Sequence, residues 1–159
     1  MKLLYEPLNG EEGHKAGLTL LEQLYGGPLP EIRRTKLGKP YFVDSPLHFS
    51  VSHTKHYVFV ALSDKPIGID AEELDRDIKL SLAEKFLSPG EYAQYEKAED
   101  QRLALLRFWV LKEAAGKCDG RGLQLWPNHT DFSLNDPRIQ EIAGCFVAVI
   151  EEKENPYAV

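Results

Sequence analysis

The sequence predicts an α+β fold, with a mainly antiparallel sheet, packed helices and two small, pseudo-related lobes. Strand-like runs fill the first half of the chain, helical periodicities dominate residues 80–117, and two strand-like runs close it. At 159 residues, 43% of them hydrophobic, the chain is long enough to bury one well-packed core. We expect one compact domain over residues 1–159, with an N-terminal lobe at about 1–65 and a C-terminal lobe at about 66–159.

Composition excludes several classes of function. The formal net charge of -6 argues against general nucleic-acid binding, which favours a basic surface. No apolar run approaches the length of a membrane span and the N-terminus lacks a signal-peptide pattern, so we expect a cytoplasmic protein without a membrane partner. Cys118 and Cys145 are the two cysteines, and no Cys-x-x-Cys suggests a zinc site or disulfide framework.

The first half is expected to contain short strands around one helix. Its expected elements are a strand at 2–6, a helix at 11–25, a strand at 41–43 and a hairpin formed by 47–52 and 57–62, bending near 52–55. The helix has an apolar stripe formed by Leu18, Leu21, Leu24 and Tyr25, and ends before Gly26. Between helix and strand lies a polar, basic stretch at 31–36.

The next strand carries two acids on one face. From residue 67 to 72 apolar side chains alternate with Gly68, Asp70 and Glu72, which is the period-two pattern of a strand. Asp70 and Glu72 therefore point to the same side, and their mutual repulsion is relieved if a hard divalent cation lies between them. The alternative is a solvated acidic strand end.

Helices are expected at 80–86, 89–97 and 100–117, followed by strands at 130–134 and 145–151. In the last helix Phe108, Leu111 and Ala115 recur as one buried stripe. Glu113 and Lys117, four residues apart, emerge from the same face. Alone, that pair is typical of a surface salt bridge worth a few tenths of a kcal/mol, and Trp109 is expected in the core.

Five short motifs in order resemble one family. They are Gly38-Lys39-Pro40, Phe49-Ser50-Val51-Ser52-His53-Thr54, Gly68-Ile69-Asp70-Ala71-Glu72, Phe86-Leu87-Ser88-Pro89-Gly90-Glu91-Tyr92 and Trp109-Val110-Leu111-Lys112-Glu113-Ala114-Ala115-Gly116-Lys117. Together they resemble the 4'-phosphopantetheinyl transferases, in particular the Sfp-like branch. Each motif is weak alone, but the ordered set is specific.

The resemblance implies transfer of the 4'-phosphopantetheine arm of coenzyme A to a serine of an acyl or peptidyl carrier protein, releasing adenosine 3',5'-bisphosphate. It implies that Asp70, Glu72 and Glu113 hold Mg²⁺ against the coenzyme's pyrophosphate. Glu113 would also take the serine proton, directly or through water. Lys117 would contact phosphate, and Glu91 would have a structural role.

The same resemblance assigns the coenzyme-binding residues. Ser52 and His53 would contact the 3'-phosphate, Lys39 would lie nearby in the adenylate pocket, and Lys112 would help to bind the coenzyme. The alternatives are a hairpin-turn histidine making local contacts and a solvated turn lysine.

Full-length members of the branch that this chain resembles consist of roughly two similar lobes. Only a short segment precedes Gly38 here, so we expect a reduced N-terminal lobe and a monomer. The carrier is expected to contact the helices at 80–97 and the loop at 122–126. Two other functions remain open: a non-catalytic coenzyme A or carrier-protein binding homologue, and a Mg²⁺-dependent nucleotide hydrolase. No Gly-x-x-x-x-Gly-Lys-Ser/Thr loop supports the second.

Overall fold

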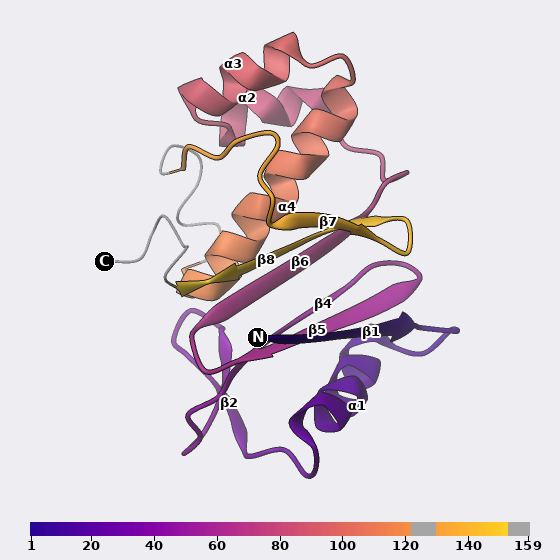
Figure 1. Ribbon diagram of the computed structural model, residues 1–159, viewed down its shortest axis with the longest axis vertical. Helices are drawn as coiled ribbons and strands as arrows, with labels where there is room; N and C mark the ends of the chain where they lie inside the picture. Colours follow the sequence, from indigo (N-terminus) through magenta and orange to yellow (C-terminus); the bar gives the residue numbers. More distant parts are fainter. Residues whose placement is uncertain (122–129, 153–159) are drawn as a thin grey trace.

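A computed structural model describes residues 1–121 and 130–152 (Figure 1). The elements are β1 (Lys2–Pro7), α1 (Gly13–Tyr25), β2 (Ile32–Arg34), β3 (Pro40–Phe42), β4 (His48–His53), β5 (Tyr57–Ser63), β6 (Ile67–Glu73), a 3-10 turn (Leu80–Leu82), α2 (Ala83–Phe86), α3 (Pro89–Lys97), α4 (Gln101–Asp119), β7 (Ile139–Ile142) and β8 (Cys145–Glu151). The predicted α+β class is confirmed.

Two antiparallel three-stranded sheets have the same strand order. The first sheet is β1-β5-β4 and the second is β6-β8-β7, so in each the strand that comes first along the chain pairs with the last. A long helix separates the first strand from the hairpin in both, α1 in one case and α4 in the other. This shared arrangement agrees with the predicted pair of related lobes, although the sequence contains no recognisable internal repeat.

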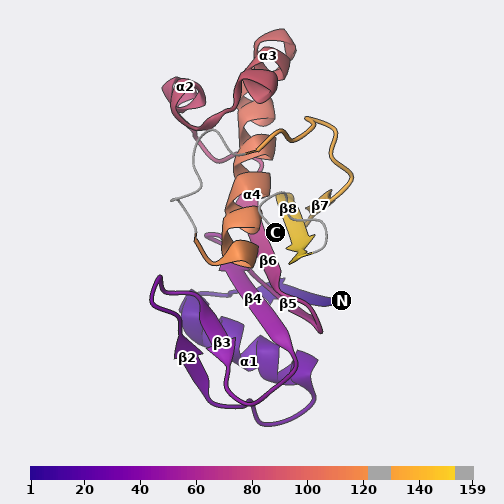
Figure 2. The same ribbon diagram turned by 90° about the vertical axis from the view of Figure 1, so that its left-hand side faces the viewer.

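Alternation along β5 divides the core. Val58, Val60 and Leu62 face α1 and form one apolar cluster with it, whereas Phe59 and Ala61 belong to a cluster shared with β6 and β8. The other side of the second sheet packs against α4, which also supports α2 and α3. α1 and α4 thus lie on opposite sides of the two sheets (Figures 1 and 2).

Strands β4 and β6 lie side by side without a backbone ladder, and we call this contact the seam. The hydroxyl of Ser50 accepts a hydrogen bond from the amide of Ile69 at 3.0 Å, and that of Ser52 accepts one from Ala71 at 3.1 Å. Both amides are on the side of β6 that does not pair with β8. Side chains therefore satisfy this edge of the second sheet, as buried amides require.

Several expected elements differ from the structure. The segment 130–134 is not a strand, because Thr130 and Phe132 are buried through hydrogen bonds to the Glu91 carboxylate rather than by strand pairing. The strand that pairs with β8 is β7, which was not predicted. β2 was also missed, since its three residues carry little pattern.

The buried face of α1 includes small residues that a search for large apolar side chains does not detect. Its buried residues are Gly13, Ala16, Gly17, Leu20 and Leu21. The predicted stripe is correct for Leu21, which is buried, and for Leu24 and Tyr25, which pack against the same core cluster, but it omits the buried Leu20. Glycines at 13 and 17 let this helix approach β4 closely.

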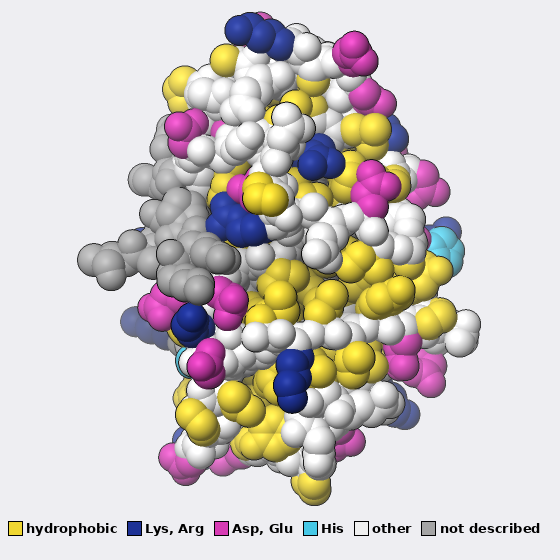
Figure 3. All heavy atoms as spheres, in the orientation of Figure 1, with side chains coloured by type: hydrophobic (Ala, Val, Ile, Leu, Met, Phe, Trp, Pro, Cys, Tyr) yellow, Lys and Arg dark blue, Asp and Glu magenta, His cyan; other side chains and the backbone are white. Residues whose placement is uncertain are grey.

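The surface agrees with this arrangement. Hydrophobic side chains gather over the middle of the face shown in Figure 3, across strands of both sheets, with charged groups more frequent towards the margins. Among the described helices, none is long and apolar enough to cross a membrane.

Candidate active site

The candidate site forms where α4 crosses β6. A Cβ placed on Gly68 would lie 2.0 Å from the carbonyl oxygen of Ala114 and 2.4 Å from the amide nitrogen of Cys118, so only glycine permits the observed contact. The close crossing places Glu113 and Lys117, one turn apart on α4, beside Asp70 on β6. The glycine of the Gly-x-Asp-x-Glu pattern thus has a packing reason.

The three predicted acids meet at one pocket, which we call the acidic pocket. It has a volume of about 430 Å³. Its lining includes Asp70, Glu72 and Glu113, together with Ser52 and Lys117. Asp70 is only 6% exposed, and its Oδ2 is buried without a hydrogen-bond partner among the described residues. A buried carboxylate oxygen without a donor is a suitable ligand for a hard cation.

Burial raises the pKa values of these acids, and repulsion by a neighbouring acid adds to the shift for Asp70 and Glu113. The pKa of Asp70 is raised to about 8, mainly by burial; Lys117 opposes the shift, and Glu72 and Glu113 add to it. Burial likewise raises the pKa of Glu72, against the effect of Arg76, and that of Glu113, against the effect of Lys117. Added positive charge would therefore stabilise all three carboxylates in their ionised forms.

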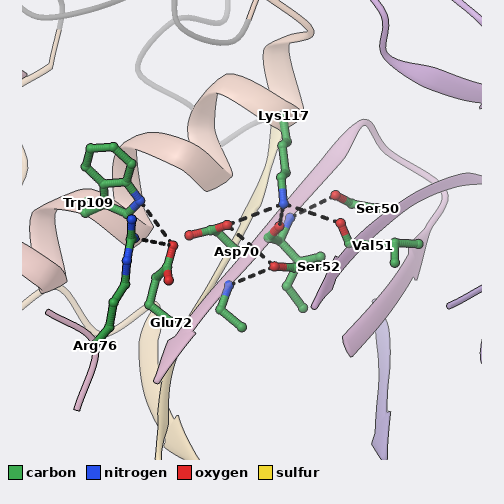
Figure 4. A network of polar contacts seen from close by, with 10 residues as sticks. Ser50, Val51, Ser52, Asp70, Glu72, Arg76, Trp109 and Lys117 are labelled. Atoms are coloured by element: carbon green, nitrogen blue, oxygen red, sulfur yellow. Dashed lines mark hydrogen bonds and ion pairs between the residues drawn. The ribbon is translucent and has the colours of Figure 1, made fainter. Parts of the chain in front are cut away.

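Glu72 is held in place by two neighbours that sequence reasoning did not connect with it (Figure 4). Its Oε1 accepts a hydrogen bond from Trp109 Nε1 at 3.2 Å and pairs with Arg76 at 2.8 Å. The Arg76 guanidinium also lies 5.2 Å from the centroid of the Trp109 ring. Trp109 packs on Phe86 as a core residue would, but its polar edge belongs to the site.

The three carboxylates line one pocket without converging on a single point. Across residues 1–121 and 130–152, no group of three or more His, Cys, Asp or Glu side chains is arranged to hold a metal ion. Both contacts of Glu72 use Oε1, which leaves its Oε2 outside them. The donor chemistry of the pocket fits a hard divalent cation, with Glu72 turned towards Arg76 in this structure.

Lys117 lies across the seam, between the two sheets (Figure 4). Its Nζ donates to the carbonyl oxygens of Ile69 on β6 at 2.9 Å and of Val51 on β4 at 3.3 Å, and it lies 3.4 Å from Asp70 Oδ1. Lys117 therefore does not form a simple surface salt bridge with Glu113. It contacts Asp70 and the backbones of β4 and β6 instead. Its charge is fixed beside the acidic pocket.

A second opening of similar volume adjoins the acidic pocket, and we call it the main cavity. Its volume is about 420 Å³. Val51, His53, Glu113 and Lys117 line both spaces, so the two lie next to each other. The charged or titratable side chains of its lining are His14, Arg34, Lys39, His53, Lys112, Glu113 and Lys117. Four of these side chains are Lys or Arg and one is an acid, so the charged lining of the main cavity is mainly basic, although the net charge of the protein is -6.

The predicted coenzyme ligands do not all line the same space. Lys39 and His53 line the main cavity, but Ser52 does not: it is buried in the seam and lines the acidic pocket. Sequence reasoning missed His14, and it left open whether Arg34 adds positive charge to the site or belongs to a plain basic surface; the structure places Arg34 in the lining of the main cavity. The basic stretch before the Gly38-Lys39-Pro40 motif was the available signal for Arg34.

Lys39 and Lys112 both have partners within the protein. The Nζ of Lys39 donates to the carbonyl oxygen of Cys118 at 2.6 Å, in the last turn of α4, and burial lowers its pKa. Lys112 is 1% exposed and pairs with Glu91, 0% exposed, at 2.8 Å; its Nζ also bonds to Thr130. The two lysines therefore differ: Lys39 borders open space, whereas the Lys112 ammonium is engaged in the interior.

Glu91 has the structural role that was expected of it. It completes the capping box of α3 with Ser88. Its Oε2 accepts hydrogen bonds from Thr130 at 2.8 Å and from the amide of Phe132 at 2.9 Å. Glu91 thereby ties α3, α4 and the segment after residue 129 together.

Comparison with known proteins agrees with this geometry. A family model described as the 4'-phosphopantetheinyl transferase superfamily matches residues 66–154, which include both the acidic strand and α4. The 4'-phosphopantetheinyl transferase gsp of Aneurinibacillus migulanus is 35% identical over 95 residues, 58% of this chain and 39% of that protein. Sfp of Bacillus subtilis is 36% identical over 91 residues, 55% of this chain and 40% of Sfp. AcpT of Salmonella typhimurium is 39% identical over 116 residues, 70% of this chain and 59% of AcpT.

The chain therefore belongs to the 4'-phosphopantetheinyl transferase superfamily, and its similarity to Sfp confirms the predicted resemblance to the Sfp-like branch. The chain spans about two fifths of the length of gsp and of Sfp.

Proposed function

We propose that this protein transfers the 4'-phosphopantetheine arm of coenzyme A to a serine of an acyl or peptidyl carrier protein, releasing adenosine 3',5'-bisphosphate. One observation carries the proposal: a cavity whose charged side chains are mainly basic lies next to a pocket lined by three carboxylates, and the two share four lining residues. The two-part ligand matches this division. Its nucleotide end carries phosphate groups that need cations, and its reacting pyrophosphate needs a bound metal ion and a base.

The main cavity would bind the nucleotide end of coenzyme A. Lys39, Arg34 and His53 supply positive charge or hydrogen-bond donors for phosphate. Leu18, Ile32 and Phe49 give the same cavity an apolar portion, which suits a base. Lys117 would contact the pyrophosphate, since it lies at the junction between the cavity and the acidic pocket.

Asp70, Glu72 and Glu113 would hold Mg²⁺, with the unpartnered Oδ2 of Asp70 as the observation that supports the assignment. The ion would supply charge neutralisation at the leaving pyrophosphate. Arg76 and Trp109 would orient Glu72 through its Oε1.

Glu113 is the proposed general base. Its carboxylate accepts no hydrogen bond from a described residue, and it lines both the main cavity and the acidic pocket. It would take the proton of the carrier serine as the serine oxygen attacks the β-phosphorus of coenzyme A, and the leaving group would depart as adenosine 3',5'-bisphosphate.

The carrier protein would approach from the side of Arg76 and Trp109, which line the acidic pocket. Leu80, which is 44% exposed, is an apolar side chain in the nearby segment that leads to α2. The other predicted carrier contact, the loop at 122–126, lies outside the described residues.

Intact-protein mass spectrometry tests the reaction. An apo carrier protein incubated with this protein, coenzyme A and Mg²⁺ should gain the mass of one phosphopantetheine arm, and EDTA should prevent the gain. Glu113→Gln should abolish the gain without unfolding the protein, whereas Glu22→Gln, an exposed change on α1, should leave it intact.

The other outcomes identify the alternatives. Coenzyme A binding without a mass gain on any carrier would favour the non-catalytic binding homologue. Cleavage of coenzyme A without an arm-bearing carrier would favour the hydrolase.

A further inference from the structure

Gly13, the first residue of α1, lies directly against the imidazole of His53. A Cβ placed on Gly13 would be 2.5 Å from His53 Cγ and 2.7 Å from both Cδ2 and Nδ1. Contacts of a Cβ under 3.0 Å are essentially never observed, so an alanine here would require the ring to move. Gly13 is buried beneath the ring.

The backbone gives no other reason for a glycine at this position. Gly13 is not among the residues with positive φ, so its conformation is open to any amino acid. Glycine is also a poor helix former, and alanine would suit the start of α1 better. Space for the His53 ring is the remaining requirement.

His53 stands where the two parts of the site join. It is the last residue of β4, its side chain is exposed, and it lines both the main cavity and the acidic pocket. The ring therefore lies against Gly13 on one side, and it lines both the main cavity and the acidic pocket.

We propose that Gly13 is a positioning residue, which turns the His53 imidazole towards a phosphate group of the coenzyme by leaving its own Cα uncovered. The proposal rests on the proposed function, in which His53 contacts that phosphate. Gly17, one turn further on, makes a similar approach to Val51, where a Cβ would lie 2.7 Å from Cγ1. Gly17 thus offers a matched control for a general displacement of α1 from β4.

A double-mutant cycle on coenzyme A affinity tests the proposal. Gly13→Ala and His53→Ala should each weaken binding by about tenfold or more, the usual effect of losing one charge-assisted hydrogen bond. Gly13→Ala should have no further effect in the His53→Ala background, because the group it displaces is then absent. Gly17→Ala and His53→Ala should instead combine additively. In turnover, Gly13→Ala should raise KM for coenzyme A and leave kcat nearly unchanged.

A second readout needs no coenzyme. The NMR signals of the His53 ring, assigned by their loss in His53→Ala, should shift in Gly13→Ala and not in Gly17→Ala. Unchanged ring signals, or equal losses of affinity from Gly13→Ala with and without His53, would overturn the proposal. If the wild type bound no coenzyme A, the proposed function would fall, while the ring signals would still decide whether Gly13 positions His53.

Discussion

Replacing Asp70 by asparagine should stabilise the metal-free protein, and the gain should grow as the pH rises. Burial raises the pKa of this carboxyl from 3.8 to about 8 in the folded protein. Between these two values the folded state binds a proton that the unfolded chain has released, so the free energy of unfolding decreases with increasing pH. Asparagine keeps the shape of the side chain but cannot ionise, so this loss should disappear.

The magnitude follows from the pKa shift. Four units correspond to at most about 6 kcal/mol, since each unit is worth about 1.4 kcal/mol, and the loss should be complete near pH 8. At low pH the wild type does not lose this stability, because the Asp70 carboxyl is then protonated in both the folded and the unfolded state. Most of the difference between wild type and variant should therefore develop from about pH 5 to pH 8.

Urea unfolding in EDTA across that pH range measures the effect, with the exposed Asp64→Asn as the matched control. Wild type and Asp64→Asn should lose stability with rising pH, and Asp70→Asn should lose distinctly less. Parallel curves for wild type and Asp70→Asn would show that Asp70 does not carry this penalty. Added Mg²⁺ should restore stability to the wild type at high pH and have little effect on Asp70→Asn.

Two further changes test the interior. Lys112→Met should lower the free energy of unfolding by about 3–5 kcal/mol, because it leaves the Glu91 carboxylate buried without its cation. The double variant with Glu91→Gln should recover much of this loss in denaturant unfolding. If Lys112→Met instead left stability intact and weakened coenzyme binding, Lys112 would be the ligand that the motif predicts. Ser52→Ala should cost about 1–3 kcal/mol, since the Ala71 amide loses its acceptor, while the exposed Ser81→Ala should be neutral by the same measurement. Equal stabilities for the two serine variants would argue against the seam hydrogen bond.

The periodic elements of the site were predictable from the sequence. A period of two placed Asp70 and Glu72 on one face of β6, and a spacing of four placed Glu113 and Lys117 on one face of α4. The pattern also contained the glycine that allows the two elements to cross, although its reason appears only in the contact with Ala114.

Contacts between distant segments were not predictable in this way. Arg76 follows β6 in a loop, and it joins the site because its guanidinium stacks on Trp109, which lies on another element. The Glu91–Lys112 pair joins two helices, and no local spacing distinguishes such a pair from two surface charges. Ser52 lies within a recognisable motif, yet its hydroxyl is used by a β6 amide.

The seam provides a natural probe of how tightly the two sheets stay together. The amides of Ile69 and Ala71 are protected by serine hydroxyls from the first sheet, whereas neighbouring amides of β6 bond to β8 within their own sheet. A brief separation of the sheets would expose the first group to deuterium exchange and leave the second protected. Exchange at Ile69 and Ala71 would therefore measure the opening of the protein along the line where its two ligand spaces meet, and bound coenzyme would slow it.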